Sequence, residues 1–502
     1  MHLYRDNIRK LHSKNYPLRA LAAVIGLAWS GALVITIWTP DNYSQVYQLQ
    51  TCSTGWPELG RPLMNLLYCT IFNGAFQPQL QLVLGLACLF ALSILIALSW
   101  NLTRPEFLIA GSVICTYPFL CNIFGFETGK FSIPFALLVA SASWQALESP
   151  RWLIRLAPAA LLLSAGMSLY QTCINFLLCL ILLSLLFELT GQNIDRRRIK
   201  EKIIQYLAKG SSLIGLAAGI YIIATELTRR LGGIGYNVRY NNIRGFETLP
   251  GLIRELRDIG AHYKFYLLPG HPISPAVFGF VVLGSLAITI CSFLARCGKG
   301  CGPNKSINQQ YAISLILLPA SYIAVWSTDL PIAGSLLGDG YRHTYPVVLP
   351  FAATIILAFR ACASHRYLQK VVSIGACLSV FSFIVADSTW AFDTYRLGLF
   401  DLSLGTRTLS RLQEIDPKGK KELLIQGSLS AASRPKGLAN KGYDVLGSGF
   451  DNSGSAYALL QNLGLKNPPL SGIQPSQCLD IFESKQITTI NSQCLLLNLD
   501  NL

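Results

Sequence analysis

Charge is scarce in this sequence of 502 residues. Asp, Glu, Lys and Arg together make up 13% of the chain, which is about half of their share in a typical soluble domain. Hydrophobic residues make up 52%, and this composition excludes both a disordered chain and an ordinary soluble enzyme. The net charge of +15 does not indicate a nucleic-acid binder, because the basic residues form short clusters between apolar runs. Such clusters are typical of a polytopic membrane protein.

Other features are missing as well. No internal repeat is visible, which argues against a transporter built from inverted repeats. No apolar run carries an ionisable residue near its middle, where a transport path would need one, and Glu188, Glu226 and Asp387 all fall at the ends of runs. No cleavage site of small residues follows the first apolar run, so we expect a retained helix and not a signal peptide.

The apolar runs that are long enough to cross a bilayer number about eleven. They cover residues 20–38, 79–100, 106–122, 131–147, 152–169, 172–189, 210–227, 275–295, 310–326, 344–361 and 370–388. If the N-terminus is cytoplasmic, the cytoplasmic segments hold twenty Lys and Arg, whereas the short outside loops hold only Arg61, Lys130 and Arg342. This bias follows the positive-inside rule. The sequence therefore predicts an α-helical polytopic membrane protein with about eleven transmembrane helices and a C-terminus outside. An interfacial helix is expected at 62–76, leading into the second span.

The composition changes near residue 389. Residues 389–502 contain no spanning run, but they show helical periodicity at 400–413 and 455–464 and strand-like patterns at 422–427 and 493–499. We predict two domains, a transmembrane domain at 1–388 and a small α/β domain at 389–502 on the outer face. Cys478 and Cys494 are candidates there for a disulfide.

Polar side chains gather in the outside loops, which places the candidate site at the outer membrane boundary. Loop 39–61 offers Trp56 and the charged residues Asp41, Glu58 and Arg61. Loop 121–130 offers Glu127 and Lys130, which could equally form a plain turn with a surface ion pair of little energetic weight.

Two further segments carry candidate residues. Loop 327–343 ends in Tyr341, Arg342 and His343, and Arg342 could bind a phosphate with both of its terminal nitrogens or simply anchor the helix at the membrane surface. Tyr170 and Gln171 stand at the outer end of the fifth span, where they suit hydrogen bonds to a sugar or to a neighbouring helix. A loop carboxylate can act as a general base on a hydroxyl, and cations can stabilise a departing lipid phosphate.

Four segments of the chain resemble the serotype-converting O-antigen glucosyltransferases of enterobacteria and their phages, which are GT-C-like membrane enzymes. They are Asp41-Asn42 followed by Trp56 and Gly60-Arg61-Pro62-Leu63, then FGFETGKFSIPFALL at 124–138, SLYQTCINFLL at 168–178, and FDTYRLGLFDLSLGTRTLSRL at 392–412. The likeness covers nearly the whole chain.

The resemblance implies a bacterial inner-membrane enzyme that works on the periplasmic side. Its donor would be undecaprenyl-phosphate glucose, its acceptor a hydroxyl of an O-antigen repeat on a lipid-linked glycan, and its transfer inverting. Asp41 is then the best candidate for the base, with Glu127 as the second acid, although Asn42 stands where the family commonly has another acid. Arg61 and Arg342 would face the donor phosphate, with Lys130 as a further candidate. The substrate-binding candidates are Trp56, Glu58, Arg61, Lys130, Tyr170, Gln171, Tyr341, Arg342 and His343.

No cofactor and no nucleic acid is expected, and a divalent metal is not indicated, because only Asp41, Glu58 and Glu127 are available to hold it. Two alternatives stay open at this point. A lipid-saccharide flippase, or a protein like an O-antigen ligase or polymerase, would also be polytopic. A non-enzymatic envelope assembly protein would tolerate the loss of both Asp41 and Glu127.

Overall fold

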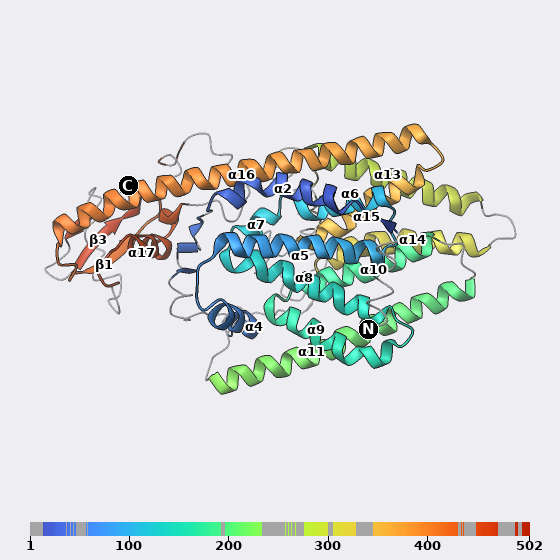
Figure 1. Cartoon of the computed structure of the whole chain (residues 1–502), viewed down its shortest axis with the longest axis horizontal. Helices are drawn as coiled ribbons and strands as arrows, with labels where there is room; N and C mark the ends of the chain where they lie inside the picture. Colours follow the sequence, from blue (N-terminus) through green and yellow to red (C-terminus); the bar gives the residue numbers. More distant parts are fainter. Residues whose placement is uncertain are drawn as a thin grey trace.

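The computed structural model describes most of the chain. The described residues are 14–36, 38–40, 42–43, 45–46, 57, 59–191, 196–232, 257, 260, 263, 267, 276–299, 305–327, 345–429, 433, 435, 448–469, 487–489 and 494–502. The structure is mostly helical, and its helices form an elongated bundle with a small sheet at one end (Figure 1).

The bundle is built from helices that fall on the predicted apolar runs. They are α2 (Leu18–Val34), α5 (Pro78–Ser99), α6 (Arg104–Thr116), α8 (Glu127–Leu147), α9 (Trp152–Leu169), α10 (Cys173–Gly191), α11 (Arg196–Gly232), α13 (Ala276–Lys299), α14 (Lys305–Ala324), α15 (Val348–Ala361) and α16 (Arg366–Ile415). By length and composition, α5, α9, α10, α11, α13 and α16 could each cross a membrane, while α2 and the helical segment 345–361 are apolar but shorter. The protein therefore has the helices of a membrane protein, and the count of eleven spans stays a prediction.

Short helices connect the long ones at the end of the bundle that lies near the sheet. Helix α4 (Pro62–Asn65) continues into the π-helix η1 (Leu66–Ile71), in the segment for which an interfacial helix is predicted. Helix α7 (Leu120–Phe124) precedes α8. The segment 121–130 is thus largely helical, and the expectation of a plain surface turn is wrong, because its side chains are buried inside the bundle.

Helix α8 packs closely on α5, because glycine stands at their contact. A Cβ atom on Gly85 of α5 would overlap the carbonyl oxygen of Lys130 in the first turn of α8. Small residues of this kind let two membrane helices approach to backbone contact. The close approach fixes where α8 begins, and with it the position of Glu127.

Helix α16 has 50 residues and links the bundle to the C-terminal sheet (Figure 1). It passes through residue 389 without a break, so the predicted domain boundary does not coincide with the end of a helix. The boundary itself stays a prediction.

The C-terminal residues form a three-stranded sheet in the order β1–β3–β2. Strand β1 (Glu422–Gln426) pairs in parallel with β3 (Cys494–Asn498), and β2 (Ile487–Thr489) pairs with β3 in antiparallel orientation. Both β1 and β3 lie where strands are predicted from sequence. The helix predicted at 455–464 is α17 (Ser453–Asn462), which follows the 3-10 turn η6 (Gly449–Asp451), and a second 3-10 turn, η8 (Leu499–Asn501), closes the chain.

Two main hydrophobic cores hold these parts together, besides a small cluster of Leu185, Leu189 and Ile199 between α10 and α11. The larger lies inside the bundle, and the smaller lies between the sheet, α17 and the end of α16, with Leu412, Phe450 and Leu495 at its centre. Tyr43, from the first predicted outside loop, is buried in this smaller core. The first loop is therefore packed against the C-terminal part of the chain.

Candidate functional site

A buried ion pair stands at the start of α8. Glu127 and Lys130 are separated by one helical turn, and their Oε2 and Nζ atoms lie 2.9 Å apart. The side chain of Glu127 is fully buried, and that of Lys130 is 3% exposed. The backbone N–H of Gln77 donates to the other carboxylate oxygen, Oε1, at 3.1 Å. Both oxygens of Glu127 therefore have donors, and the prediction of a weak surface ion pair is wrong because neither charge reaches solvent.

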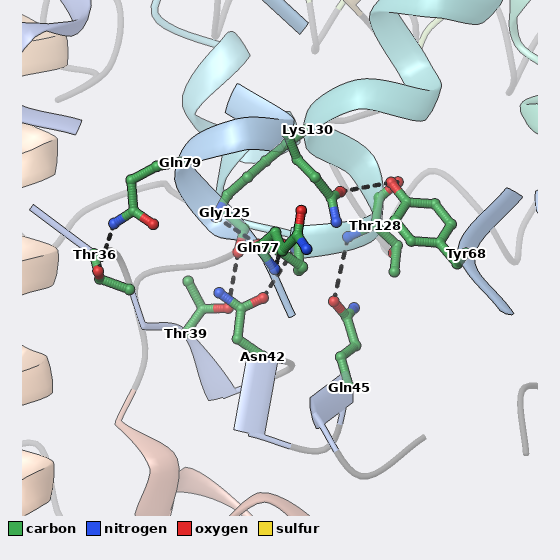
Figure 2. A network of polar contacts seen from close by, with 12 residues as sticks. Thr36, Thr39, Asn42, Gln45, Tyr68, Gln77, Gln79, Gly125, Thr128 and Lys130 are labelled. Atoms are coloured by element: carbon green, nitrogen blue, oxygen red, sulfur yellow. Dashed lines mark hydrogen bonds and ion pairs between the residues drawn. The ribbon is translucent and has the colours of Figure 1, made fainter. Parts of the chain in front are cut away.

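The first loop caps this helix from a distance of 85 residues in sequence. The side-chain oxygen of Asn42 accepts the backbone N–H of Glu127 at 3.0 Å, and Gln45 lies 3.4 Å from the N–H of Thr128. Thr39 donates to the carbonyl oxygen of Gly125 at 2.9 Å (Figure 2). The first N–H groups of a helix lack partners within the helix. Here the loop supplies them, and Asn42 is completely buried as a result.

The π-helix η1 contributes a second layer to this network. The hydroxyl of Tyr68 lies 2.7 Å from the carbonyl oxygen of Thr128 and 2.8 Å from the side-chain oxygen of Gln81 (Figure 2). Tyr68 is fully buried. Nearby, Gln79 donates to Thr36 at 2.6 Å, which ties the start of α5 to the end of α2. We call the group of Asn42, Tyr68, Gln77, Glu127 and Lys130 the α8 network.

A second polar cluster surrounds Arg61, which directly precedes α4. Its Nε atom donates to the side-chain oxygen of Gln171 at 3.1 Å, and its guanidinium lies 4.9 Å from the centre of the Tyr170 ring. The amide of Gln171 donates in turn to the carbonyl oxygen of Leu59 at 2.8 Å. The hydroxyl of Tyr221 donates to the carbonyl oxygen of Gly60, whose positive φ of 69° suits glycine. The structure thus brings together three predicted site residues, Arg61, Tyr170 and Gln171.

The two terminal nitrogens of Arg61 determine what this cluster can bind. Within the described residues, no hydrogen bond engages its two terminal nitrogens, and the residue is partly exposed. A guanidinium held by Nε and by an aromatic ring presents its terminal nitrogens in a fixed orientation, which suits a phosphate or carboxylate group. Tyr221 has no counterpart among the predicted residues, and its sequence context, an apolar helix, gives no signal of this contact.

A disulfide-bonded cysteine, Cys69 in η1, lies at the same end of the bundle. Its partner is not among the nine cysteines that are free. The predicted pair of Cys478 and Cys494 lies outside the residues whose side chains are described.

Asp401 joins the first loop to the C-terminal sheet. Its carboxylate accepts hydrogen bonds from the hydroxyl of Ser448 and, at 2.7 Å, from the backbone N–H of Gly449, and the hydroxyl of Tyr43 lies 3.4 Å away. Burial raises the pKa of Asp401 to about 7, although these hydrogen bonds oppose the shift. The sequence places Asp401 on a helical pattern without indicating that it is buried.

Asp387 is a further buried carboxyl on α16. It is completely buried, its Oδ1 atom lies 3.4 Å from the thiol of Cys121, and its Oδ2 atom has no partner in the described structure. The sequence places this residue at the outer end of the last predicted span and does not indicate that it is buried. Its burial follows from the packing of α7 against α16.

The remaining site candidates cannot be located. Asp41, Trp56, Glu58, Tyr341, Arg342 and His343 all lie outside the described residues. Within the residues that are described, no three His, Cys, Asp or Glu side chains gather into a group that could hold a metal ion.

Comparison with known proteins gives one match. The family model described as "Glucosyl transferase GtrII" matches residues 32–389. No curated protein and no solved structure matches the chain.

Proposed function

Because the chain belongs to the GtrII glucosyl transferase family, we propose that it transfers a glucosyl group from a polyprenyl-phosphate donor to a hydroxyl of an O-antigen repeat. The family supports a glycosyltransferase of O-antigen modification. The donor, the side of the membrane and the roles of individual residues are our proposal.

The reaction is a single displacement at the anomeric carbon. Asp41 accepts the proton of the acceptor hydroxyl, whose oxygen forms a bond to C1 of the sugar as the bond from C1 to the phosphate oxygen breaks. Polyprenyl phosphate leaves with the electron pair, and the configuration at C1 inverts. General-base help of this kind typically contributes 10²- to 10⁴-fold to a rate.

One observation carries the assignment of Asp41. Its neighbour in the chain, Asn42, is buried and accepts a hydrogen bond from the backbone N–H of Glu127. This bond anchors the chain beside Asp41 to the first turn of α8, where the positive end of the helix dipole favours a nearby carboxylate. An amide at position 42 meets this need, whereas a second acid there would stand close to the buried Glu127.

Glu127 is better suited to hold the site than to take the proton. Its two oxygens already accept from Lys130 and Gln77, and its side chain is fully buried. We therefore assign Glu127 and Lys130 to positioning. Lys130 is occupied in the same way, which supports Arg61 as the cation that meets the donor phosphate.

The proposed side of the membrane is the periplasm. Disulfides form in oxidising compartments and are rare in the cytosol, and Cys69 directly follows Tyr68 of the α8 network in the chain. The bias of Lys and Arg in the sequence favours the same orientation.

A transfer assay with purified protein tests the proposal. We would supply synthetic polyprenyl-phosphate glucose and an O-antigen-bearing lipid and compare the wild type with Asp41→Asn. The variant is expected to lose at least about 10²-fold in transfer rate. Glu414→Gln is the matched control, since Glu414 is an exposed acid at the far end of α16.

The outcomes separate the alternatives. A folded Asp41→Asn variant with near-full activity would remove Asp41 from catalysis. If the folded wild type uses no polyprenyl-phosphate sugar but does use a diphosphate-linked glycan, the protein is a ligase and not the enzyme proposed here.

A further inference from the structure

A polar cavity lies at the opposite end of the bundle from the candidate site. It has a volume of about 500 Å³ and is enclosed by the ends of α5, α8 and α10, by α11, and by Arg360 of α15. Helix α8 connects the two ends, since Glu127 begins it and the cavity residue Glu148 follows it. With a rise of 1.5 Å per residue, its 21 residues separate the two sites by about 30 Å. This distance is close to the hydrocarbon thickness of a bilayer.

Cations outnumber carboxylates among the residues that line this cavity. The cations are Lys14, Lys202, Lys209 and Arg360, and the carboxylates are Glu148 and Glu188. Arg360 is already paired with Glu106, and Lys202 with Glu188 at 2.5 Å. Lys14 donates to the carbonyl oxygen of Leu102. These contacts hold the positive side chains in place around the cavity.

Lys209 is the exception. The residue is only 5% exposed and lines the cavity, but it has neither a hydrogen bond nor an ion pair with any described residue. Glu148 and Glu188 attract Lys209 electrostatically, but Glu148 accepts a hydrogen bond from Gln145 at 2.6 Å and Glu188 forms its ion pair with Lys202. An ammonium that is buried without a hydrogen bond or a close ion pair of its own is costly. It therefore indicates a negatively charged ligand.

The aromatic wall of the cavity offers further donors. Trp100 stacks on Phe187, which in turn lies under the guanidinium of Arg360. Trp100 and Trp144 both line the cavity, and the indole N–H of each lacks an acceptor within the described part of the chain. The wall is thus rich in donors and poor in acceptors, which suits an oxyanion.

The outer surface next to the cavity is apolar. On α11, Ile204 and Leu207 are 55% and 63% exposed, and they alternate with the cavity residues Gln205, Tyr206 and Lys209. One face of this helix therefore lines the cavity while the adjoining face is apolar and exposed. An acyl chain on that face would leave its headgroup at the cavity.

We propose that this cavity binds a phosphate group, with Lys209 as its principal cation, and that the phosphate belongs to the headgroup of an anionic phospholipid. In the orientation proposed above, the cavity opens toward the cytoplasmic leaflet. Basic pockets between membrane helices on that side are known to bind anionic headgroups. Free phosphate offers the same chemistry without the acyl chains, and the test below separates the two sources.

Thermal unfolding of the purified full-length protein in a neutral detergent tests this site. We would add short-chain phosphatidylglycerol, short-chain phosphatidylcholine or inorganic phosphate and measure Tm. A ligand that binds only the folded state raises Tm with its concentration. We expect phosphatidylglycerol to raise Tm, phosphatidylcholine to have little effect, and Lys209→Met to abolish the rise. Lys200→Met is the matched control, since Lys200 is an exposed lysine on the same helix.

Each outcome of this experiment supports or overturns the proposed phosphate site. A rise with inorganic phosphate that depends on Lys209 supports the phosphate site and identifies free phosphate as its source. An equal rise in the wild type and in Lys209→Met overturns the proposal, as does the lack of any rise in the wild type, which requires no variant to fold. If Lys209→Met does not fold, Lys209→Gln is measured in its place.

Discussion

Two glutamates of this protein are buried in ion pairs at opposite ends of the bundle. At one end Glu127 pairs with Lys130 within a single turn of α8. At the other end Glu106 of α6 binds Arg360 of α15 through two hydrogen bonds of 2.7 and 2.9 Å. Arg360 keeps 27% of its side chain exposed, whereas neither member of the first pair is more than 3% exposed.

The difference lies in what each pair connects. Glu106 and Arg360 join two helices that are 254 residues apart, and Glu106 also accepts the backbone N–H of Thr103 to cap its own helix. Glu127 and Lys130 join no two helices. They fix the first turn of α8 against Gln77 and the loop that carries Asn42. The Glu106–Arg360 pair stabilises the bundle, and the Glu127–Lys130 pair shapes one end of it.

Breaking the fully buried pair should have the largest effect on stability. Lys130→Met leaves Glu127 charged and without a cation, and we expect a loss of about 3–5 kcal/mol in the free energy of unfolding. The double variant Glu127→Gln with Lys130→Met removes both charges and should recover part of that loss. Reversible unfolding in mixed micelles measures both. A double variant no more stable than Lys130→Met would contradict the ion pair.

Breaking the partly exposed pair of Glu106 and Arg360 should lower the free energy of unfolding by a smaller amount. It should leave the rate of sugar transfer unchanged. Glu106→Gln keeps one side-chain oxygen as an acceptor, so it should lose about one of the two hydrogen bonds from Arg360, which contributes about 1.5–3 kcal/mol. Transfer per folded molecule should stay at the wild-type level, because this pair lies at the end of the bundle away from the site. A selective loss of transfer in Glu106→Gln would show that the two ends are coupled.

A substitution in the Arg61 cluster should change the affinity for the donor and leave folding intact. Arg61→Lys loses the Nε bond to Gln171 and the planar contact with Tyr170. We expect KM for the donor to rise about tenfold, which corresponds to the loss of about one good hydrogen bond, while folding is retained. Arg407→Lys serves as the control, since Arg407 is exposed on α16. Equal KM values in the two variants would assign Arg61 a structural role.

The last effect concerns pH at the junction of the first loop and the C-terminal sheet. The pKa of Asp401 is raised to about 7 in the folded protein, so the folded state holds a proton that the unfolded state releases near pH 4. Stability should therefore fall as pH rises from about 4 to about 7 and level off above that range. Asp401→Asn should remove this part of the pH dependence of Tm. An unchanged profile in that variant would mean that other groups control it.

The sequence predicted the helices better than the contacts between them. Apolar runs fall on helices because burial or lipid contact requires them, and strands β1 and β3 were visible as short apolar patterns. The sequence analysis placed Arg61 and Gln171 at the same outer boundary of the membrane, but it did not predict the direct contact between them. The burial of Glu127 and Lys130 was missed, because a short polar segment between apolar runs resembles an exposed turn.

The sequence by itself determined that this is a helical membrane protein, since low charge and long apolar runs permit little else. Its glucosyltransferase family followed from the resemblance of four segments and from the family match, not from composition. Tertiary structure decided which polar groups are buried and what they meet. Asn42 caps a helix that begins 85 residues later, and Lys209 lies in a cavity built from helices distant in the chain, with no close ion pair among the described residues. Such contacts depend on how helices pack, and local sequence does not encode the distance between residues so far apart.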